Sequence, residues 1–158
     1  MLSDSRPERD ARGRGHIPPD WVDTNATYFI TINCKQRGKA QLTADDMPQK
    51  IFDSVQFYQN SHRWWPEIFL LMPDHLHALI SFSWDQKKGI NTVLGSWKRF
   101  IARKYGIEWQ IDYFDHRIRN ESDHEDKWDY IRQNPVREGL VESYDQWPHV
   151  WRPGAIGW

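Results

Sequence analysis

The sequence predicts one α+β domain whose elements follow the order β-α-β-β-α-β-α. Three observations support this fold class. Short runs rich in β-branched and aromatic residues alternate with longer runs of helical periodicity. Two of the short runs flank the dipeptide Pro73-Asp74, which signals a turn. The 158 residues are enough to bury a core without an internal disulfide, which the single cysteine, Cys34, cannot form.

The first half of the predicted domain contains three strands and one helix. Residues 27–34 (TYFITINC) have the composition and length of a strand. Residues 45–60 place their apolar side chains on one helical face. The runs 67–72 and 75–82 lie on either side of the turn dipeptide, so we expect them to form a β-hairpin.

The second half is predicted to contain two helices and one strand. Residues 90–105 have helical periodicity, and 108–114 are predicted as the fourth strand. The stretch SDHE at 122–125 has the spacing of a capping box and is predicted to open the last helix. That helix should end at Asn134, because Pro135 disfavours the helical conformation of the residue before it. The complete order is that of a ferredoxin-like β-α-β-β-α-β core with one helix added.

Composition and charge narrow the function classes. The net charge of -1 and the pI near 6.6 argue against a protein that coats nucleic acid by bulk electrostatics. The ten tryptophans, six tyrosines and seven phenylalanines can fill a core or stack on unpaired bases. The longest apolar run, IFLLM, is too short to span a bilayer, and no signal-peptide pattern is present. We therefore expect a cytoplasmic protein without a membrane partner.

The stretch PDHLHALI places two histidines inside an apolar run. Residues i and i+2 of a strand share a face, so His75 and His77 point the same way, while Leu76 and Ala78 point into the core. Two converging imidazoles are as consistent with a metal site as with packed or solvated side chains.

The stretch YIRQNPVREGL places Tyr130 and Asn134 four residues apart, and therefore on one face of the last helix. Trp128 and Ile131 already provide this helix with a separate apolar face. Taken singly, the tyrosine is expected to be a boundary residue, and the asparagine a helix terminator.

Three segments together resemble a known family. MPDHLHALI followed by DYIRQNPVREGLV resembles the HUH-type single-tyrosine transposases, and FDHRIRNESD is most similar to their REP-associated branch. The resemblance covers about residues 27–141. It implies a ferredoxin-like fold in which His75 and His77 bind a divalent cation, Mg2+ or Mn2+. It also implies that Asn134 completes the metal site and that Tyr130 is the catalytic nucleophile.

The implied activity is that of a metal-dependent, single-strand-specific DNA endonuclease and strand transferase. The tyrosine would form a 5′-phosphotyrosine intermediate, on DNA that is single-stranded or folded into palindromic hairpins. Because two imidazoles and an amide suit Mg2+ poorly, Mn2+ should work at least as well. The active protein could be a monomer or a homodimer.

Three alternatives to this activity remain open. The chain could be an HUH enzyme of another role, such as replication initiation or conjugative nicking. It could be a catalytically inactive ferredoxin-like module that binds single-stranded nucleic acid through its aromatic residues. It could also be a small metalloprotein or hydrolase that uses His75 and His77 alone.

Basic residues in three regions are the predicted DNA contacts. One face of the 90–105 helix is basic, further arginines surround the predicted tyrosine, and the N-terminal arm has a flexible RGRG stretch that could enter a DNA groove. An ordinary solvated surface would explain the helix face equally well, and a solvated tail is the favoured explanation of the arm. The predicted set is Arg12, Arg14, Lys98, Arg99, Arg103, Arg117, Arg119, Arg132 and Arg137.

Within this set, Arg132 is the residue most expected to touch DNA. His116 and His124 are predicted to be polar surface or DNA-contacting positions rather than metal ligands. The predicted organisation is a flexible arm at 1–20, the HUH transposase domain at 21–145, and an irregular tail at 146–158 that straps across the domain.

Overall fold

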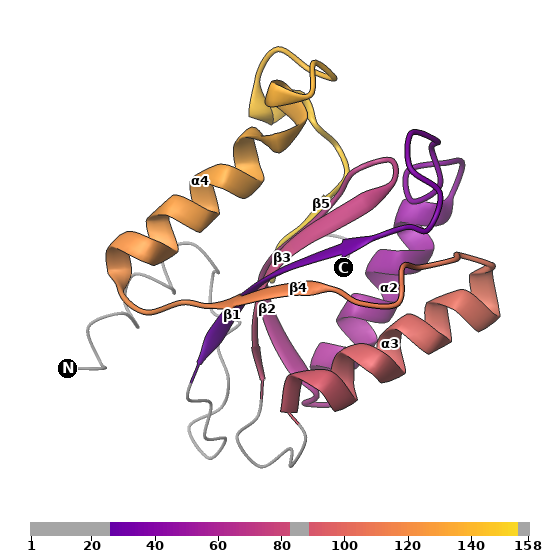
Figure 1. The fold of residues 1–158 in the computed structure, drawn as a ribbon, viewed down its shortest axis with the longest axis horizontal. Helices are drawn as coiled ribbons and strands as arrows, with labels where there is room; N and C mark the ends of the chain where they lie inside the picture. Colours follow the sequence, from indigo (N-terminus) through magenta and orange to yellow (C-terminus); the bar gives the residue numbers. More distant parts are fainter. Residues whose placement is uncertain (1–25, 83–88, 155–158) are drawn as a thin grey trace.

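The computed structural model describes residues 26–82 and 89–154. The predicted arm at 1–20, with Arg12 and Arg14, lies outside these residues. Within them, an antiparallel sheet has helices on both faces (Figure 1). The elements are β1 (Thr27–Asn33), α2 (Met47–Asn60), β2 (Trp64–Leu71), β3 (His75–Phe82), α3 (Gly89–Tyr105), β4 (Phe114–Arg117), α4 (Glu121–Arg137), the 3-10 turn η2 (Tyr144–Gln146) and β5 (Val150–Trp151).

The strand order is β4-β1-β3-β2-β5, with every neighbouring pair antiparallel. The first four strands, with α2 and α3 as their connections, form the ferredoxin-like core, and α4 follows as the added helix. The predicted fold class is therefore confirmed. None of the helices in the described ranges is long and apolar enough to cross a bilayer.

The two faces of the sheet carry different cores. The larger core lies between the sheet and helices α2 and α3, and includes Leu76, Ala78 and Ile80 of β3. The smaller core lies under α4 and includes Leu79 of the same strand. In Figure 1, α4 lies on one side of the sheet, with α2 and α3 on the other. The alternation along β3 thus places its histidines on the α4 face, together with Leu79.

The fourth strand is displaced from its predicted position. It covers Phe114–Arg117 rather than residues 108–114, and Trp109 makes only an isolated bridge to Cys34. The Lys98 ammonium donates to the carbonyl oxygens of Gln110 and Ile111 at 3.0 and 3.1 Å, so these oxygens are bonded to a side chain instead of a strand ladder.

Both ends of α4 also differ from the prediction. The N-cap is Asn120, whose side chain accepts a hydrogen bond from the Asp123 amide at 2.8 Å, so the helix does not start with the SDHE box. At the other end, Pro135 lies inside the helix, which continues to Arg137. Burial of Pro135 against the core overrides the local preference of the preceding residue, and the Glu138 amide still reaches the Asn134 carbonyl at 3.0 Å.

The tail is more regular than predicted. Val150 and Trp151 pair with Leu70 and Phe69 of β2, and Trp151 is fully buried. The indole N–H of Trp147 donates to the Leu71 carbonyl at 3.0 Å. This part of the tail covers the free edge of β2, where unpaired backbone groups would otherwise be exposed.

Candidate active site

The two histidines of β3 form the centre of the candidate site. The rings of His75 and His77 lie 4.9 Å apart between centroids, and both side chains are buried. Each Nδ1 has a partner: Asp74 Oδ1 lies 2.7 Å from His75, and Thr31 Oγ1 lies 2.8 Å from His77. With Nδ1 as the donor in both bonds, each Nε2 keeps its lone pair for a ligand.

Asp74 is held as a carboxylate behind His75. It accepts hydrogen bonds from the Gly38 amide at 2.7 Å and from the Arg37 guanidinium at 3.0 Å, and Arg37 also bonds the Asn33 side chain. Burial alone would raise the pKa of Asp74, but the hydrogen bonds from Gly38, His75 and Arg37 outweigh it and hold the pKa well below its ordinary value. The sequence indicated only a turn residue here.

His77 is held in its neutral form. Burial is the main cause, and electrostatic interactions with His75, Arg137 and Arg37 act in the same direction; together they lower the pKa of His77 to about 3. A neutral imidazole is the form that binds metal ions.

Tyr130 approaches this site from α4, and Asn134 follows it on the same helix. The Tyr130 ring lies edge-on to His77, at 5.5 Å between centroids, and edge-on to Phe29 at 5.8 Å. Tyr130 is 44% exposed, whereas Asn134, one helical turn later, is 4% exposed. The structure thus places the predicted tyrosine directly against one of the predicted metal ligands.

Two buried polar atoms of this group fit a metal ion. Among the described residues, Nε2 of His77 and Oδ1 of Asn134 have no hydrogen-bond partner. A buried polar atom without a partner is costly, and such atoms are usually satisfied by an ion or water. Two imidazole nitrogens and one amide oxygen, all electrically neutral, would bind a divalent cation and leave its other positions open to phosphate oxygens.

A second group of candidate ligands lies at the start of α4. The ligand atoms of Glu121, His124 and Glu125 lie within 4.8 Å of one another. His124 is buried, and its Nε2 is 2.6 Å from Glu67 Oε1, so the predicted surface position was wrong. The group begins nine residues before Tyr130. His124 precedes Tyr130 by six residues, which is about 9 Å along the helix axis. This second group is therefore displaced along α4 from Tyr130, whereas His77 contacts the tyrosine ring.

Arg137 is the cation that the structure places against the tyrosine. Its guanidinium lies 4.2 Å from the centre of the Tyr130 ring and donates to the Tyr130 carbonyl at 3.2 Å. Lys127 lies 5.9 Å from the centre of the Phe29 ring, on the same side of α4. Arg137 thus brings positive charge to the tyrosine, whereas the Lys127 ammonium is paired with the Asp123 carboxylate at 3.4 Å.

Arg132 was the residue most expected to touch DNA, but it lies elsewhere. Its guanidinium stacks 4.2 Å from the centre of the Tyr144 ring, in the η2 turn that follows the helix. Arg132 follows Tyr130 by two residues, which is about 200° around a helix, so the two side chains point in different directions.

Comparisons with known proteins agree with the resemblance in the three segments. No protein-family model matches the chain. The REP-associated tyrosine transposase of Escherichia coli K12 is 26% identical over 127 residues, which cover 77% of this chain and 73% of that protein. The chain is thus similar to the REP-associated tyrosine transposases, in agreement with the resemblance in its sequence.

A solved structure shares the fold of this chain. It is described as a REP-associated tyrosine transposase bound to a REP hairpin, and it superposes with a TM-score of 0.71 at 24% identity. The match covers 84% of this chain and 79% of that one.

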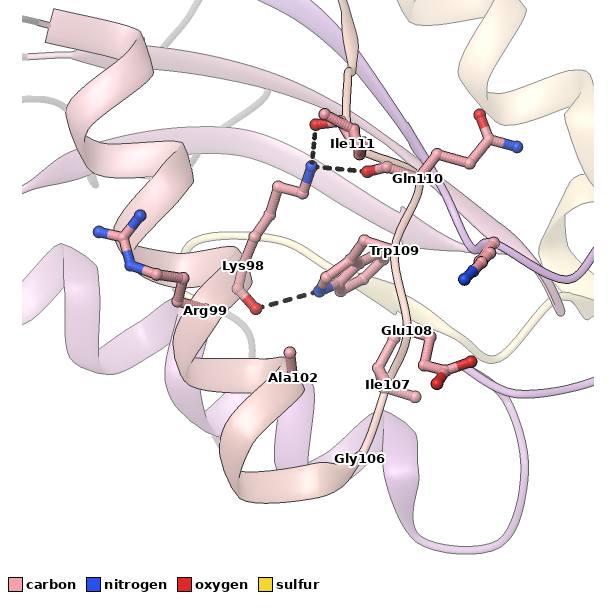
Figure 2. Close-up of a pocket in the computed structure, with 10 residues that line it drawn as sticks. Lys98, Arg99, Ala102, Gly106, Ile107, Glu108, Trp109, Gln110 and Ile111 are labelled. Atoms are coloured by element: carbon pink, nitrogen blue, oxygen red, sulfur yellow. Dashed lines mark hydrogen bonds between the residues drawn. The ribbon is translucent and has the colours of Figure 1, made fainter.

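The sheet separates the basic face of α3 from the tyrosine site. Lys98, Arg99 and Arg103 belong to the helix layer opposite α4. Arg99 and Arg103 are exposed, but Lys98 is half-buried, and burial lowers its pKa. Figure 2 shows Lys98 reaching across to the Gln110 and Ile111 carbonyls, where it fixes the chain after the helix.

A cleft of about 570 Å³ lies between α3 and this following chain (Figure 2). Its lining includes Lys35, Arg99 and Trp109. The indole N–H of Trp109 donates to the Lys98 carbonyl at 3.1 Å. This bond joins the two chain segments between which the cleft lies.

Arg117, at the end of β4, and Arg119, just after it, are not placed beside Tyr130. Arg117 pairs with Tyr28, which faces the larger core, so it points away from the α4 face. Arg119 is exposed, and its amide donates to Asp123 at 3.0 Å. His116 also bonds Asp123, at 2.9 Å, so it connects β4 to α4.

Proposed function

We propose that this chain is a metal-dependent, single-strand-specific DNA endonuclease and strand transferase that acts on REP-type palindromic hairpins. One observation carries the proposal: the Tyr130 ring packs against His77, while Nε2 of His77 and Oδ1 of Asn134 are buried without partners among the described residues. The hairpin substrate is suggested by the solved relative that is bound to one.

Tyr130 would act as the nucleophile. Its Oη attacks the scissile phosphorus and loses its proton, and the bond from phosphorus to the 3′ oxygen breaks. The 3′ oxygen takes up a proton and leaves as a hydroxyl, while the 5′ phosphate stays on Tyr130. A second 3′-hydroxyl can reverse the step and join strands without ATP, because the phosphotyrosine link keeps the energy of the broken bond.

The surrounding residues would lower the barrier by position and charge. Asp74 and Thr31 hold the two imidazoles in one orientation, and Arg137 brings a positive charge to Tyr130. A divalent cation held by His75, His77 and Asn134 would polarise a non-bridging phosphate oxygen and offset its developing charge. We expect Mn2+ to serve at least as well as Mg2+, because two of the three ligands are nitrogen.

We propose that residues 21–145 form the catalytic domain. The basic residues predicted from the sequence remain proposed DNA contacts. Of these, Arg137 is the nearest to the chemistry, since it contacts Tyr130 itself.

The test is a denaturing gel of the full chain incubated with single-stranded hairpin DNA from the flanks of its gene. The arms are Mn2+, Mg2+ and chelator, with Tyr130→Phe as the variant and Tyr144→Phe as the matched control. A covalent protein–DNA band that requires metal and Tyr130, and persists in Tyr144→Phe, supports the proposal. Native binding without a covalent band in any metal would instead support the inactive binding module.

A further inference from the structure

Phe114 lies in the same cross-strand row as the metal-site histidine His77. In β1, Thr31 pairs with His77 of β3 on one side and with Phe114 of β4 on the other. Directly paired residues of antiparallel strands share a face, and the bond between Thr31 and His77 places this row on the α4 face. Phe114 therefore lies at the outer end of a row that starts at the candidate metal site.

Phe114 belongs to a continuous aromatic strip. Its ring centroid is 6.1 Å from that of Phe29, and Phe29 lies 5.8 Å from Tyr130. Single exposed apolar residues are common on protein surfaces, but this one contacts the ring that also contacts the proposed nucleophile. Phe29 therefore contacts both Phe114 and Tyr130.

The Phe114 ring has room for a ligand. Phe114 is 57% exposed, on an edge strand that β1 pairs on one side only. It meets Phe29 at an interplanar angle of 69°, so this contact leaves at least one face of the Phe114 ring uncovered by Phe29. An uncovered aromatic face stacks well on a flat, unpaired base, whichever base it is.

The charges beside the strip suit a nucleotide. Lys127 lies 5.9 Å from the centre of the Phe29 ring, and Arg137 lies 4.2 Å from the centre of the Tyr130 ring. Aromatic faces with neighbouring cations are the usual elements of a single-stranded nucleic-acid site. A base on Phe114 would place its phosphate toward these cations and the tyrosine.

We infer that Phe114 is the stacking platform for the unpaired base next to the phosphate that Tyr130 attacks. This inference rests on the proposed function and adds a position to it. Phe114 would select for an unpaired strand, because a base inside a duplex has both faces already stacked. It would discriminate little among the four bases.

The test combines Phe114→Ala with hairpin oligonucleotides that carry one abasic site at each single-stranded position in turn. Kd is measured in the Tyr130→Phe background with Mn2+, so that no strand is cut. We expect Phe114→Ala to weaken binding of the intact oligonucleotide about five- to hundredfold. One abasic position should cause a similar loss when Phe114 is present and no further loss in the Phe114→Ala variant.

Two variants control for other effects. Phe57→Ala removes an equally exposed phenylalanine, 60% exposed on α2 across the sheet, and should leave every Kd unchanged. Phe114→Leu keeps most of the side-chain volume without an aromatic face, so it should show the same coupling if Phe114→Ala does not fold.

The inference is overturned if the losses from the variant and from the abasic sites add at every position, or if Phe114→Ala binds as its parent does. In that case a covalent band from the wild-type chain would leave the proposed function intact. If the wild-type chain neither binds nor becomes attached to any hairpin, the proposed function fails and the stacking role fails with it.

Discussion

The hydroxyl of Thr31 provides a sharp test of how the metal site is built. Thr31→Val replaces Oγ1 by a methyl group of similar size, and so removes the 2.8 Å bond to Nδ1 of His77. His77 is 3% exposed, so its Nδ1 would be left buried without a partner. We expect the free energy of unfolding to fall by about 1–3 kcal/mol.

The same substitution should weaken metal binding. Without the Thr31 bond, the ring of His77 can rotate and its Nε2 lone pair loses its fixed direction. Loss of such an orienting partner typically lowers metal affinity about 10–100-fold. The measurement is isothermal titration of the DNA-free protein with Mn2+, together with urea unfolding.

Thr27→Val is the matched control. Thr27 lies on the same strand and its Oγ1 bonds Ser81 Oγ of β3 at 2.7 Å, but neither residue touches the histidines through this bond. Thr27→Val should lower stability by a comparable amount and leave Mn2+ affinity unchanged. If the two valine variants bind Mn2+ equally well, Thr31 does not orient a metal ligand, and the site as described is wrong.

The contacts of α4 lead to three further predictions. His124→Ala leaves the buried Glu67 carboxylate without its 2.6 Å partner, so chemical denaturation should show a loss of about 3 kcal/mol, with the Mn2+ requirement for covalent DNA attachment unchanged. Arg137→Gln should slow covalent attachment about tenfold in single-turnover assays, and Arg132→Gln should leave that rate unaltered; equal slowing in both would show that proximity to the tyrosine is irrelevant. Burial would raise the pKa of Asp123, but hydrogen bonds from His116 and Arg119 lower it to about 2. The ionised carboxylate therefore adds about 1 kcal/mol, after solvent screening, to the free energy of unfolding; this stabilisation is present above about pH 4 and is lost as the pH falls toward 2. The melting temperature of Asp123→Asn should therefore fall less than that of the wild type over that interval.

The elements with a clear periodic pattern or apolar run could be predicted from the sequence. The strand at His75–Phe82 was predicted with its observed bounds, because it is a mostly apolar run of strand length that follows a turn signal. The four-residue spacing of Tyr130 and Asn134 was enough to place them on one helix face. β4 was misplaced because it is a short edge strand with mostly exposed side chains, which carries no hydrophobic alternation.

The partners of the site residues depend on register and rotation, which are not local properties of the sequence. Thr31 reaches His77 only because β1 and β3 pair in one of several registers. Whether Arg132 or Arg137 lies beside Tyr130 depends on how α4 is rotated over the sheet. Arg99 and Arg103 of the predicted basic face of α3 are exposed, but the topology of the fold places this helix on the side of the sheet away from the histidines.

The site occupies space that would otherwise be hydrophobic core. Under α4, the apolar residues Trp128 and Ile131 pack on a small group that includes Phe29 and Leu79, whereas α2 and α3 share the larger core. The neighbouring positions on the same face hold the two histidines, which contribute polar atoms instead of apolar contact. The attachment of α4 therefore rests on a smaller apolar core than that of the other two helices. A helix held in this way is the element that we expect to open first on heating, and it carries the proposed nucleophile.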